Sequence, residues 1–138
     1  MRLLKSGFAV IVPAIFILAC AAAGGGEKAE IGIEGVKALI SDSSDVLLLD
    51  VRTGAEYNGE MGHLPGAVLI PVQELKNRMT ELEPFRDRMI IVYCRSGNRS
   101  GKGTGVLIEQ GFKAFNMTGG MIAWNEKYGK HDSDETEE

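Results

Sequence analysis

The chain is built around the stretch Met89-Ile-Ile-Val-Tyr-Cys-Arg-Ser-Gly-Asn-Arg-Ser100. Its first five residues are apolar, β-branched or aromatic, a pattern typical of a strand that is covered on both faces. Gly97 and Asn98 tolerate positive φ, so the polar loop after the strand can curl tightly. A helix is expected to begin near Ser100, with its positive dipole end directed at the curl. The stretch therefore predicts a buried strand, a cysteine at its carboxyl end, a tight loop and a helix.

Cys94 lies at the start of this loop, so the loop's N–H groups can surround its sulfur. Backbone N–H groups and a helix N-terminus lower the pKa of a thiol and favour the nucleophilic thiolate. Arg95, Arg99 and Lys102 are cationic, and no acidic residue occurs between positions 88 and 108. The alternative is a structural cysteine, because free cysteine is among the most buried residue types. The cationic, glycine-bearing turn favours a reactive thiol. Such a loop can stabilise a thiolate, a persulfide or an oxyanion delivered to the sulfur.

The loop resembles the active-site loop of rhodanese-like domains, C-x-x-G-x-R-S. Other stretches resemble signatures of that family, in the family's order: Asp50-Val-Arg52 with Glu56-Tyr57, Gly62-His-Leu-Pro-Gly-Ala67, and Gly119-Gly-Met-Ile-Ala-Trp124. One such motif is weak, but several in the expected order are strong. The chain is therefore identified as a member of the rhodanese-like family from about Ile31 to Tyr128.

The order of the patterns predicts an α/β fold. Apolar runs indicate strands at Val46–Leu49, Ala67–Ile70, Met89–Tyr93 and Ala114–Met117. Helices are expected at Ile31–Ile40, Val72–Leu82, Ser100–Gln110 and Gly119–Lys127. We expect the rhodanese-like three-layer sandwich, with a mostly parallel sheet of about five strands and helices on both faces. Cys94 would then end a central strand, where open α/β sheets bind their ligands.

The resemblance implies that Cys94 is the catalytic residue. It also implies a substrate-binding loop that stabilises anionic sulfur, formed by Arg95, Ser96, Gly97, Asn98, Arg99 and Ser100. We expect Arg95 to face solvent and substrate, and Arg99 to brace the loop. Asp50, Arg52 and Glu56 are expected to support the site. Arg52 and Glu56, four positions apart, are predicted to share a short helix and to pair, and His63 is interpreted as structural rather than as a general base.

The first residues have the pattern of an export signal. Arg2 and Lys5 precede an apolar run, Phe8–Ala19, that is shorter than a membrane-spanning helix needs. Ile17-Leu-Ala-Cys20 resembles a bacterial lipobox. We therefore expect a signal peptide at 1–19, a lipid on Cys20, a flexible tether at 20–29, a rhodanese-like domain at 30–130 and an acidic tail at 131–138. This predicts a lipid-anchored protein of the periplasm or cell envelope. A signal peptide cut near residues 21–23 and an uncleaved anchor are the alternatives.

Composition and spacing argue against several other classes. The formal net charge is −4 and no basic stripe occurs, so no nucleic-acid partner is expected. No cluster has metal-ligand spacing, and neither a metal nor a cofactor is expected. Gly101, Gly103 and Gly105 match neither dinucleotide nor P-loop spacing. Asn98-Arg-Ser and Asn116-Met-Thr match glycosylation sequons, which we interpret as chance matches.

Sulfur transfer is the predicted function. The resemblance implies that Cys94 takes sulfane sulfur from a small anionic donor, such as thiosulfate or a persulfide. It would pass this sulfur through a Cys94 persulfide to a thiol acceptor, or to cyanide in vitro. One alternative is a sulfur-carrier or redox-partner module loaded by a partner protein. The other is a cysteine phosphatase, but the spacing Cys94-x4-Arg99 is one residue shorter than phosphatases use and no Asp general acid is evident. Contact with a membrane is expected only through the Cys20 lipid.

The segment Asn58–Met61 departs from the family pattern. It has four residues where the family usually has two. An insertion in a turn leaves a fold intact but reshapes the neighbouring surface. We therefore do not transfer the family's substrate specificity to this chain.

Overall fold

The computed structural model describes residues 29–130. They form a sheet of five strands in the order β1-β5-β4-β2-β3, with every pairing parallel. The strands are β1 Glu30–Ile31, β2 Val46–Asp50, β3 Val68–Leu69, β4 Met89–Tyr93 and β5 Lys113–Met117. The predicted signal peptide, the lipid on Cys20 and the acidic tail lie outside the described residues.

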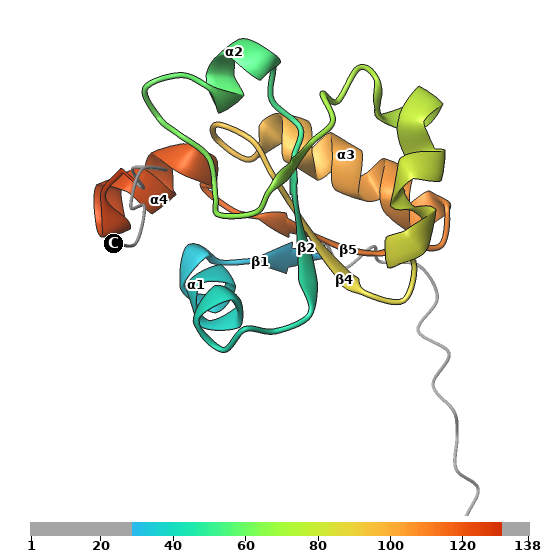
Figure 1. The fold of residues 1–138 in the computed structure, drawn as a ribbon, viewed down its shortest axis with the longest axis horizontal. Coiled ribbons are helices and arrows are strands. Elements are labelled where there is room, and N and C mark those ends of the chain that lie inside the picture. Colours follow the sequence, from blue (N-terminus) through green and yellow to red (C-terminus); the bar gives the residue numbers. More distant parts are fainter. Residues whose placement is uncertain (1–28, 131–138) are drawn as a thin grey trace, which may run out of the picture.

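Helices cover both faces of the sheet, which confirms the predicted fold class (Figure 1). They are α1 Ile33–Ser41, α2 Gly54–Tyr57, η1 Leu75–Phe85, α3 Asn98–Glu109 and α4 Gly120–Tyr128. Leu75, Leu82 and Leu107 bring η1 and α3 onto one face. Val36 and Trp124 bring α1 and α4 onto the other. Successive residues of β4 alternate between these two cores, because strand side chains alternate between faces.

The first strand and the first helix differ from the prediction. Glu30 and Ile31 pair with β5 as an edge strand, and α1 begins only at Ile33. Ala29, assigned to the tether, already accepts a hydrogen bond from the Asn116 backbone N–H at 2.8 Å. A strand of two residues is too short to leave a periodic pattern, so no sequence signal marked it.

The helix predicted at Val72–Leu82 is instead a 3₁₀ segment, η1, that runs from Leu75 to Phe85. Leu75 and Leu82 point into the core, as the periodicity predicted. Arg78 has non-helical dihedrals (φ −114°, ψ 16°) that divide the segment. Pro84, without an N–H group, cannot join a regular α-helical hydrogen-bond ladder, whereas short 3₁₀ runs need few consecutive bonds.

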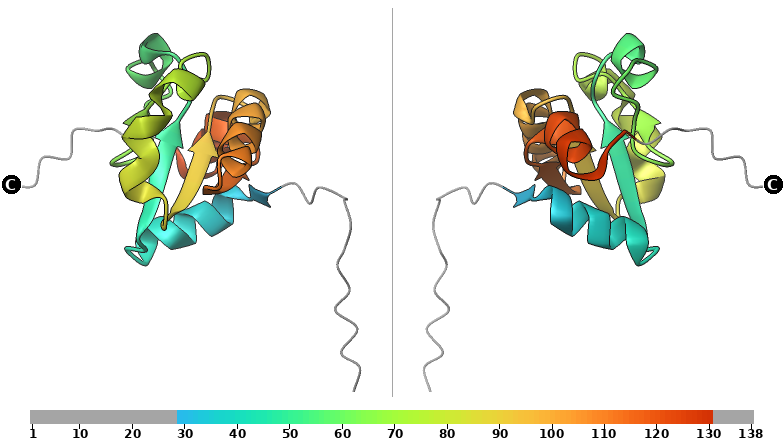
Figure 2. Two further views of the ribbon diagram at one scale, coloured as in Figure 1. Left: turned by 90° about the vertical axis from the view of Figure 1, so that its right-hand side faces the viewer. Right: turned by 90° about the vertical axis from the view of Figure 1, so that its left-hand side faces the viewer.

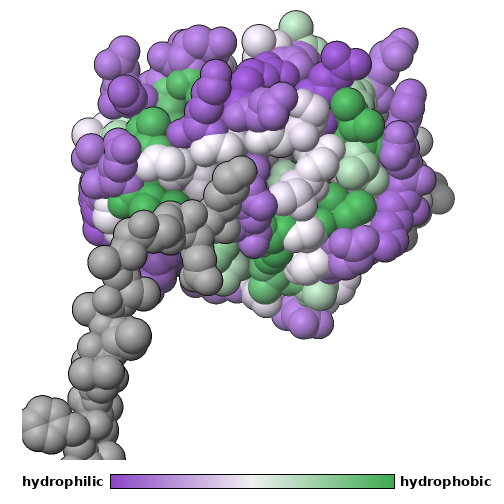
Figure 3. Space-filling view, turned by 180° about the vertical axis from the view of Figure 1, so that it is seen from behind, coloured by the Kyte–Doolittle hydropathy of each residue, from purple (hydrophilic) through white to green (hydrophobic). Residues whose placement is uncertain are grey.

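The surface of the described residues is mainly polar. Figure 3, seen from behind, shows hydrophilic side chains interrupted by separate apolar patches. Ile108, 46% exposed, is the large hydrophobic residue of this part of the chain that is most open to solvent. None of the helices within residues 29–130 is long and apolar enough to span a membrane.

Candidate functional site

Cys94 directly follows β4, at the carboxyl end of the sheet. The arrowheads of β2 and β4 point to the same end of the molecule, where α2 also lies (Figure 2). Only 1% of Cys94 is exposed. Its Sγ accepts hydrogen bonds from the Gly97 backbone N–H at 3.1 Å and from the Ser100 hydroxyl at 3.2 Å. The loop therefore curls around the sulfur.

The loop stabilises the thiolate form of Cys94. Burial alone raises the pKa of the thiol, but hydrogen bonds from the Ser100 hydroxyl and from the backbone N–H groups of Ser100, Gly97 and Ser96 outweigh it, and the net pKa is lowered. Gly97 caps α3 with φ +105°, a conformation that glycine adopts without steric cost. Within residues 29–130, Cys94 forms no disulfide. The site is thus a buried sulfur whose thiolate form is favoured by hydrogen bonds, which is the setting of a reactive thiol.

The start of α4 holds the other side of this loop. The backbone N–H groups of Met121 and Ile122 donate to the carbonyl oxygens of Cys94 and Arg95 at 2.9 and 3.0 Å. Gly120 has φ +57°, and a Cβ there would lie 2.6 Å from the Cys94 carbonyl oxygen. Only glycine permits so close an approach. Sequence patterns placed these residues in a family signature but did not assign them to the site, and the adjacent glycines were the available signal.

Arg99 braces the loop against α2. Its guanidinium donates two hydrogen bonds to the Glu56 carboxylate, at 2.8 and 2.6 Å. This ion pair, with the hydrogen bonds from Thr53, lowers the pKa of Glu56 to about 2. Glu56 also completes a capping box with Thr53 at the start of α2. The side-chain charge of Arg99 is therefore neutralised by Glu56 at the rim of the site.

The predicted pair between Arg52 and Glu56 is wrong. Thr53 is the N-cap of α2 and the helix begins at Gly54, so Arg52 lies outside it. Arg52 pairs instead with Asp50, with Nη2 2.6 Å from Oδ2, and both side chains are almost completely buried. Nη2 also donates to the carbonyl oxygen of Gly62 at 2.7 Å. Asp50 and Arg52 thus join the turn after β2 to a distant loop.

The remaining loop residues face outward. Arg95, Ser96 and Asn98 are all open to solvent. His63 stacks on Tyr57 with ring centroids 3.7 Å apart, and its Nδ1 lies 3.0 Å from the Tyr57 carbonyl oxygen. These contacts of His63 are structural.

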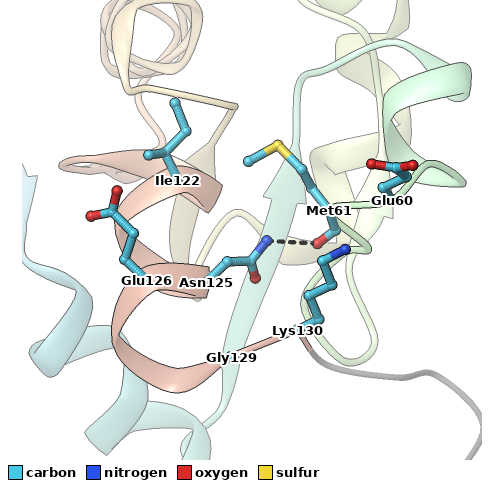
Figure 4. Close-up of a pocket in the computed structure, with 7 residues that line it drawn as sticks. All are labelled: Glu60, Met61, Ile122, Asn125, Glu126, Gly129 and Lys130. Atoms are coloured by element: carbon cyan, nitrogen blue, oxygen red, sulfur yellow. Dashed lines mark hydrogen bonds between the residues drawn. The ribbon is translucent and has the colours of Figure 1, made fainter.

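The Asn58–Met61 segment borders a groove against α4 (Figure 4). The groove has a volume of about 440 Å³, and the side chains of Met61 and Ile122 lie on its two sides. Asn125 fastens the segment to α4 by donating from Nδ2 to the Met61 carbonyl oxygen at 3.0 Å. Ile122 is also the residue whose N–H holds the Arg95 carbonyl. The insertion therefore shapes the surface beside the cysteine loop.

No group of three or more potential metal ligands occurs among residues 29–130. The described site consists of the Cys94 thiol, hydroxyl and backbone N–H donors, the Arg95 guanidinium, and the Arg99 guanidinium paired with the Glu56 carboxylate. Such a site suits nucleophilic chemistry on sulfur.

Comparison with known proteins defines the class. The family profile described as "Rhodanese-like domain" matches residues 33–127. A sulfurtransferase of Allochromatium vinosum is 40% identical over 96 residues, which span 69% of this chain and 86% of that protein. The chain belongs to the rhodanese-like domain family.

Two further matches add detail. The putative sulfur carrier protein YrkF of Bacillus subtilis is 36% identical over 71% of this chain and 51% of its own length. The crystal structure of a rhodanese-like domain protein from Staphylococcus aureus superimposes with a TM-score of 0.64, at 30% identity over 72% of this chain and 93% of that one. The structural match agrees with the architecture described above.

Proposed function

We propose that this protein is a sulfurtransferase that moves sulfane sulfur from thiosulfate or a small persulfide to a thiol through a persulfide on Cys94. The observation that carries this proposal is the pair of hydrogen bonds to Sγ, from the Gly97 N–H and the Ser100 hydroxyl. They stabilise the Cys94 thiolate, both as the nucleophile that attacks the donor and as the leaving group when the outer sulfur is passed on. The similarity to a sulfurtransferase supports the same reaction class.

In the first half-reaction, the Cys94 thiolate attacks the outer sulfur of thiosulfate. An S–S bond forms to Sγ, the S–S bond of the donor breaks, and its electron pair leaves with sulfite. Because only 1% of Cys94 is exposed, a narrow donor that presents a sulfur atom end-on suits the site better than a bulky one. The exposed Arg95 guanidinium attracts the anionic donor.

In the second half-reaction, an acceptor thiolate attacks the outer sulfur of the persulfide. The Sγ–S bond breaks and its electron pair returns to Sγ, which restores the thiolate. Cyanide as acceptor gives thiocyanate by the same bond changes. Two half-reactions on one thiol predict ping-pong kinetics.

Mass spectrometry of the purified protein after incubation with thiosulfate tests this proposal. We expect the Cys94 peptide to gain one sulfur atom, and to lose it when cyanide is added with release of thiocyanate. Cys94→Ser is the control: it should abolish both events, because the serine hydroxyl is not ionised near neutral pH, and it should leave the thermal unfolding midpoint nearly unchanged. Turnover that survives in Cys94→Ser contradicts the mechanism.

The similarity to a putative sulfur carrier favours a second candidate. In that case Cys94 receives sulfur from a partner protein and reacts poorly with thiosulfate. The same experiment separates the two, because a carrier gains no sulfur from thiosulfate but gains it from a persulfidated protein donor.

We further propose that the domain works outside the cytoplasm, anchored by a lipid on Cys20. The lipobox-like stretch at Ile17–Cys20 supports this proposal. Expression in a bacterium with labelled fatty acid should give a membrane-associated, labelled protein, and Cys20→Ser should remove the label. A chain that stays unlabelled and in the cytoplasmic fraction contradicts the proposal.

A further inference from the structure

We propose that Asn116 is a positioning residue for the Cys94 thiolate, acting through Gly97. This inference rests on the reactive Cys94 of the proposed function. Gly97 N–H donates directly to Sγ at 3.1 Å. Whatever orients Gly97 therefore also controls how well the loop stabilises negative charge on the sulfur.

Gly97 needs such orientation. Glycine has no side chain, so its backbone has more conformational freedom than that of any other residue. Gly97 uses this freedom to adopt φ +105°. Its carbonyl oxygen is held from two directions. The Gly101 N–H donates to it at 3.0 Å as part of α3, and Asn116 Nδ2 donates to it at 3.3 Å from the neighbouring strand. Together these bonds hold the Gly97–Asn98 peptide. Through the Gly97 Cα they limit how far the adjoining Ser96–Gly97 peptide, whose N–H is directed at Sγ, can turn.

The structure accommodates the asparagine closely. Asn116 lies in β5, where it pairs with Val92 of β4, and it is only 7% exposed. A Cβ on Gly101 would lie 3.5 Å from Asn116 Nδ2, an ordinary contact distance, so this part of α3 packs directly beside the amide. This burial also shields the Asn116 sequon in the folded domain.

The amide oxygen of Asn116, Oδ1, indicates why asparagine rather than an apolar residue occurs here. Asn116 Oδ1 is buried and has no hydrogen-bond partner in the described part of the chain. A buried acceptor without a partner destabilises a protein, and an apolar side chain of similar shape would avoid that cost. The hydrogen bond from Asn116 Nδ2 to the Gly97 carbonyl offsets the cost of the unpaired Oδ1. Gly97 in turn donates to Sγ, so this hydrogen bond influences the sulfur.

The test is the rate of Cys94 alkylation by iodoacetamide as a function of pH, which requires no sulfur donor. In Asn116→Leu we expect the apparent pKa of Cys94 to rise by about half a unit or more, because one hydrogen bond that orders the thiolate's donor is lost. At a pH below that pKa, alkylation should slow by about threefold. Asn116→Val, smaller and well suited to a strand, provides a second measurement if the leucine variant does not fold.

Asn125→Leu is the matched control. Asn125 likewise donates from Nδ2 to a loop carbonyl, that of Met61, and likewise has a buried Oδ1 without a partner in residues 29–130 (Figure 4). Its loop does not contact Sγ, so its alkylation profile should match the wild type.

An unchanged profile in the folded Asn116 variants overturns the inference, as does an equal shift in Asn125→Leu. Alkylation is independent of sulfur transfer, so this outcome is distinct from a failure of the proposed function. If Cys94 takes no sulfur from thiosulfate but its pKa still depends on Asn116, only the proposed function fails.

Discussion

Two neighbouring strands, β2 and β4, end side by side, and each carries a buried ionisable group into its following turn. Asp50 ends β2, opposite Tyr93 in the register of the sheet, and Cys94 is the first residue after β4. The Asp50 carboxylate is matched by a buried guanidinium, Arg52. The Cys94 sulfur receives only N–H and O–H donors from the described residues, while the nearby Arg99 is paired with Glu56.

The difference separates a structural site from a reactive one. The buried Asp50–Arg52 pair is matched in charge and holds turns in place through its bond to the Gly62 carbonyl, although Arg52 Nη1 has no hydrogen-bond partner among the described residues. The Cys94 sulfur accepts hydrogen bonds from neutral donors, with the positive charge of Arg99 nearby, and keeps lone pairs available for a new bond. The sheet thus positions a closed ion pair and an open nucleophile at adjacent strand ends.

The largest expected effect on stability comes from breaking the closed pair. Asp50→Asn should destabilise the domain by about 3–5 kcal/mol, because it leaves the Arg52 guanidinium buried without a counter-charge. Urea unfolding measures this effect. The double variant with Arg52→Met should recover part of the loss, because no unpaired charge then remains. If Asp50→Asn unfolds like the wild type, the buried pair does not have the structural role assigned here.

Gly120→Ala tests the support under the reactive loop. A Cβ at this position would lie 2.5 Å from the Arg95 carbonyl oxygen, and the alanine would have to adopt φ +57°. We therefore expect a loss of roughly 2–3 kcal/mol in the free energy of unfolding. Gly66→Ala is the control, since Gly66 lies in the turn closed by the Ala67 N–H and the Leu64 carbonyl and has φ +70° with open space around it. It should lose only about 1 kcal/mol. Equal losses in the two variants would show that contact with the loop contributes nothing.

Ser100→Ala sharpens the comparison at the open nucleophile. The Ser100 hydroxyl favours the thiolate, so its removal should raise the pKa of Cys94 and move the alkylation profile to higher pH. At pH values below the wild-type pKa, the thiolate fraction and the alkylation rate of the variant should be about tenfold lower than those of the wild type. At high pH the alkylation rates of the two proteins should become equal. A rate ratio that is the same at every pH would contradict a pKa effect. Circular dichroism checks the fold.

Gly105→Ala has the smallest expected effect. Gly105 lies in α3, and a Cβ there would meet no atom within 4 Å. Alanine should therefore stabilise the domain by about 0.5–1 kcal/mol. The control is Gly103→Ala in the same helix, where a Cβ would meet Leu75 Cδ2 at 3.4 Å and the gain should be smaller. Thermal unfolding reports both. The Cys94 alkylation profile of Gly105→Ala should not change, and a change there would show that helix stability and thiol reactivity are coupled.

Local patterns predicted the parts of the site that depend on neighbouring residues. The apolar run placed β4 at Met89–Tyr93, as observed. The glycine in the loop marked the one residue of that turn with positive φ. Both features follow from backbone sterics and from burial on two faces, which act over a few residues.

Contacts between distant segments escaped prediction. Arg99 and Glu56 are 43 positions apart, and Asn116 and Gly97 are 19 apart. Helical spacing favoured Arg52 as the partner of Glu56, but the helix starts after Arg52. The edge strand β1 depends entirely on its pairing with β5, and has no pattern of its own.

The sequence by itself determined the central strand, the cysteine at its end, the curled loop and the family, because periodicity and glycine positions are local properties of a chain. Only the tertiary structure decided which charges pair, how α4 approaches the loop and why Asn116 is buried beside Gly97. Those choices depend on which groups the packed sheet brings within hydrogen-bond distance, and spacing along the chain does not contain that information.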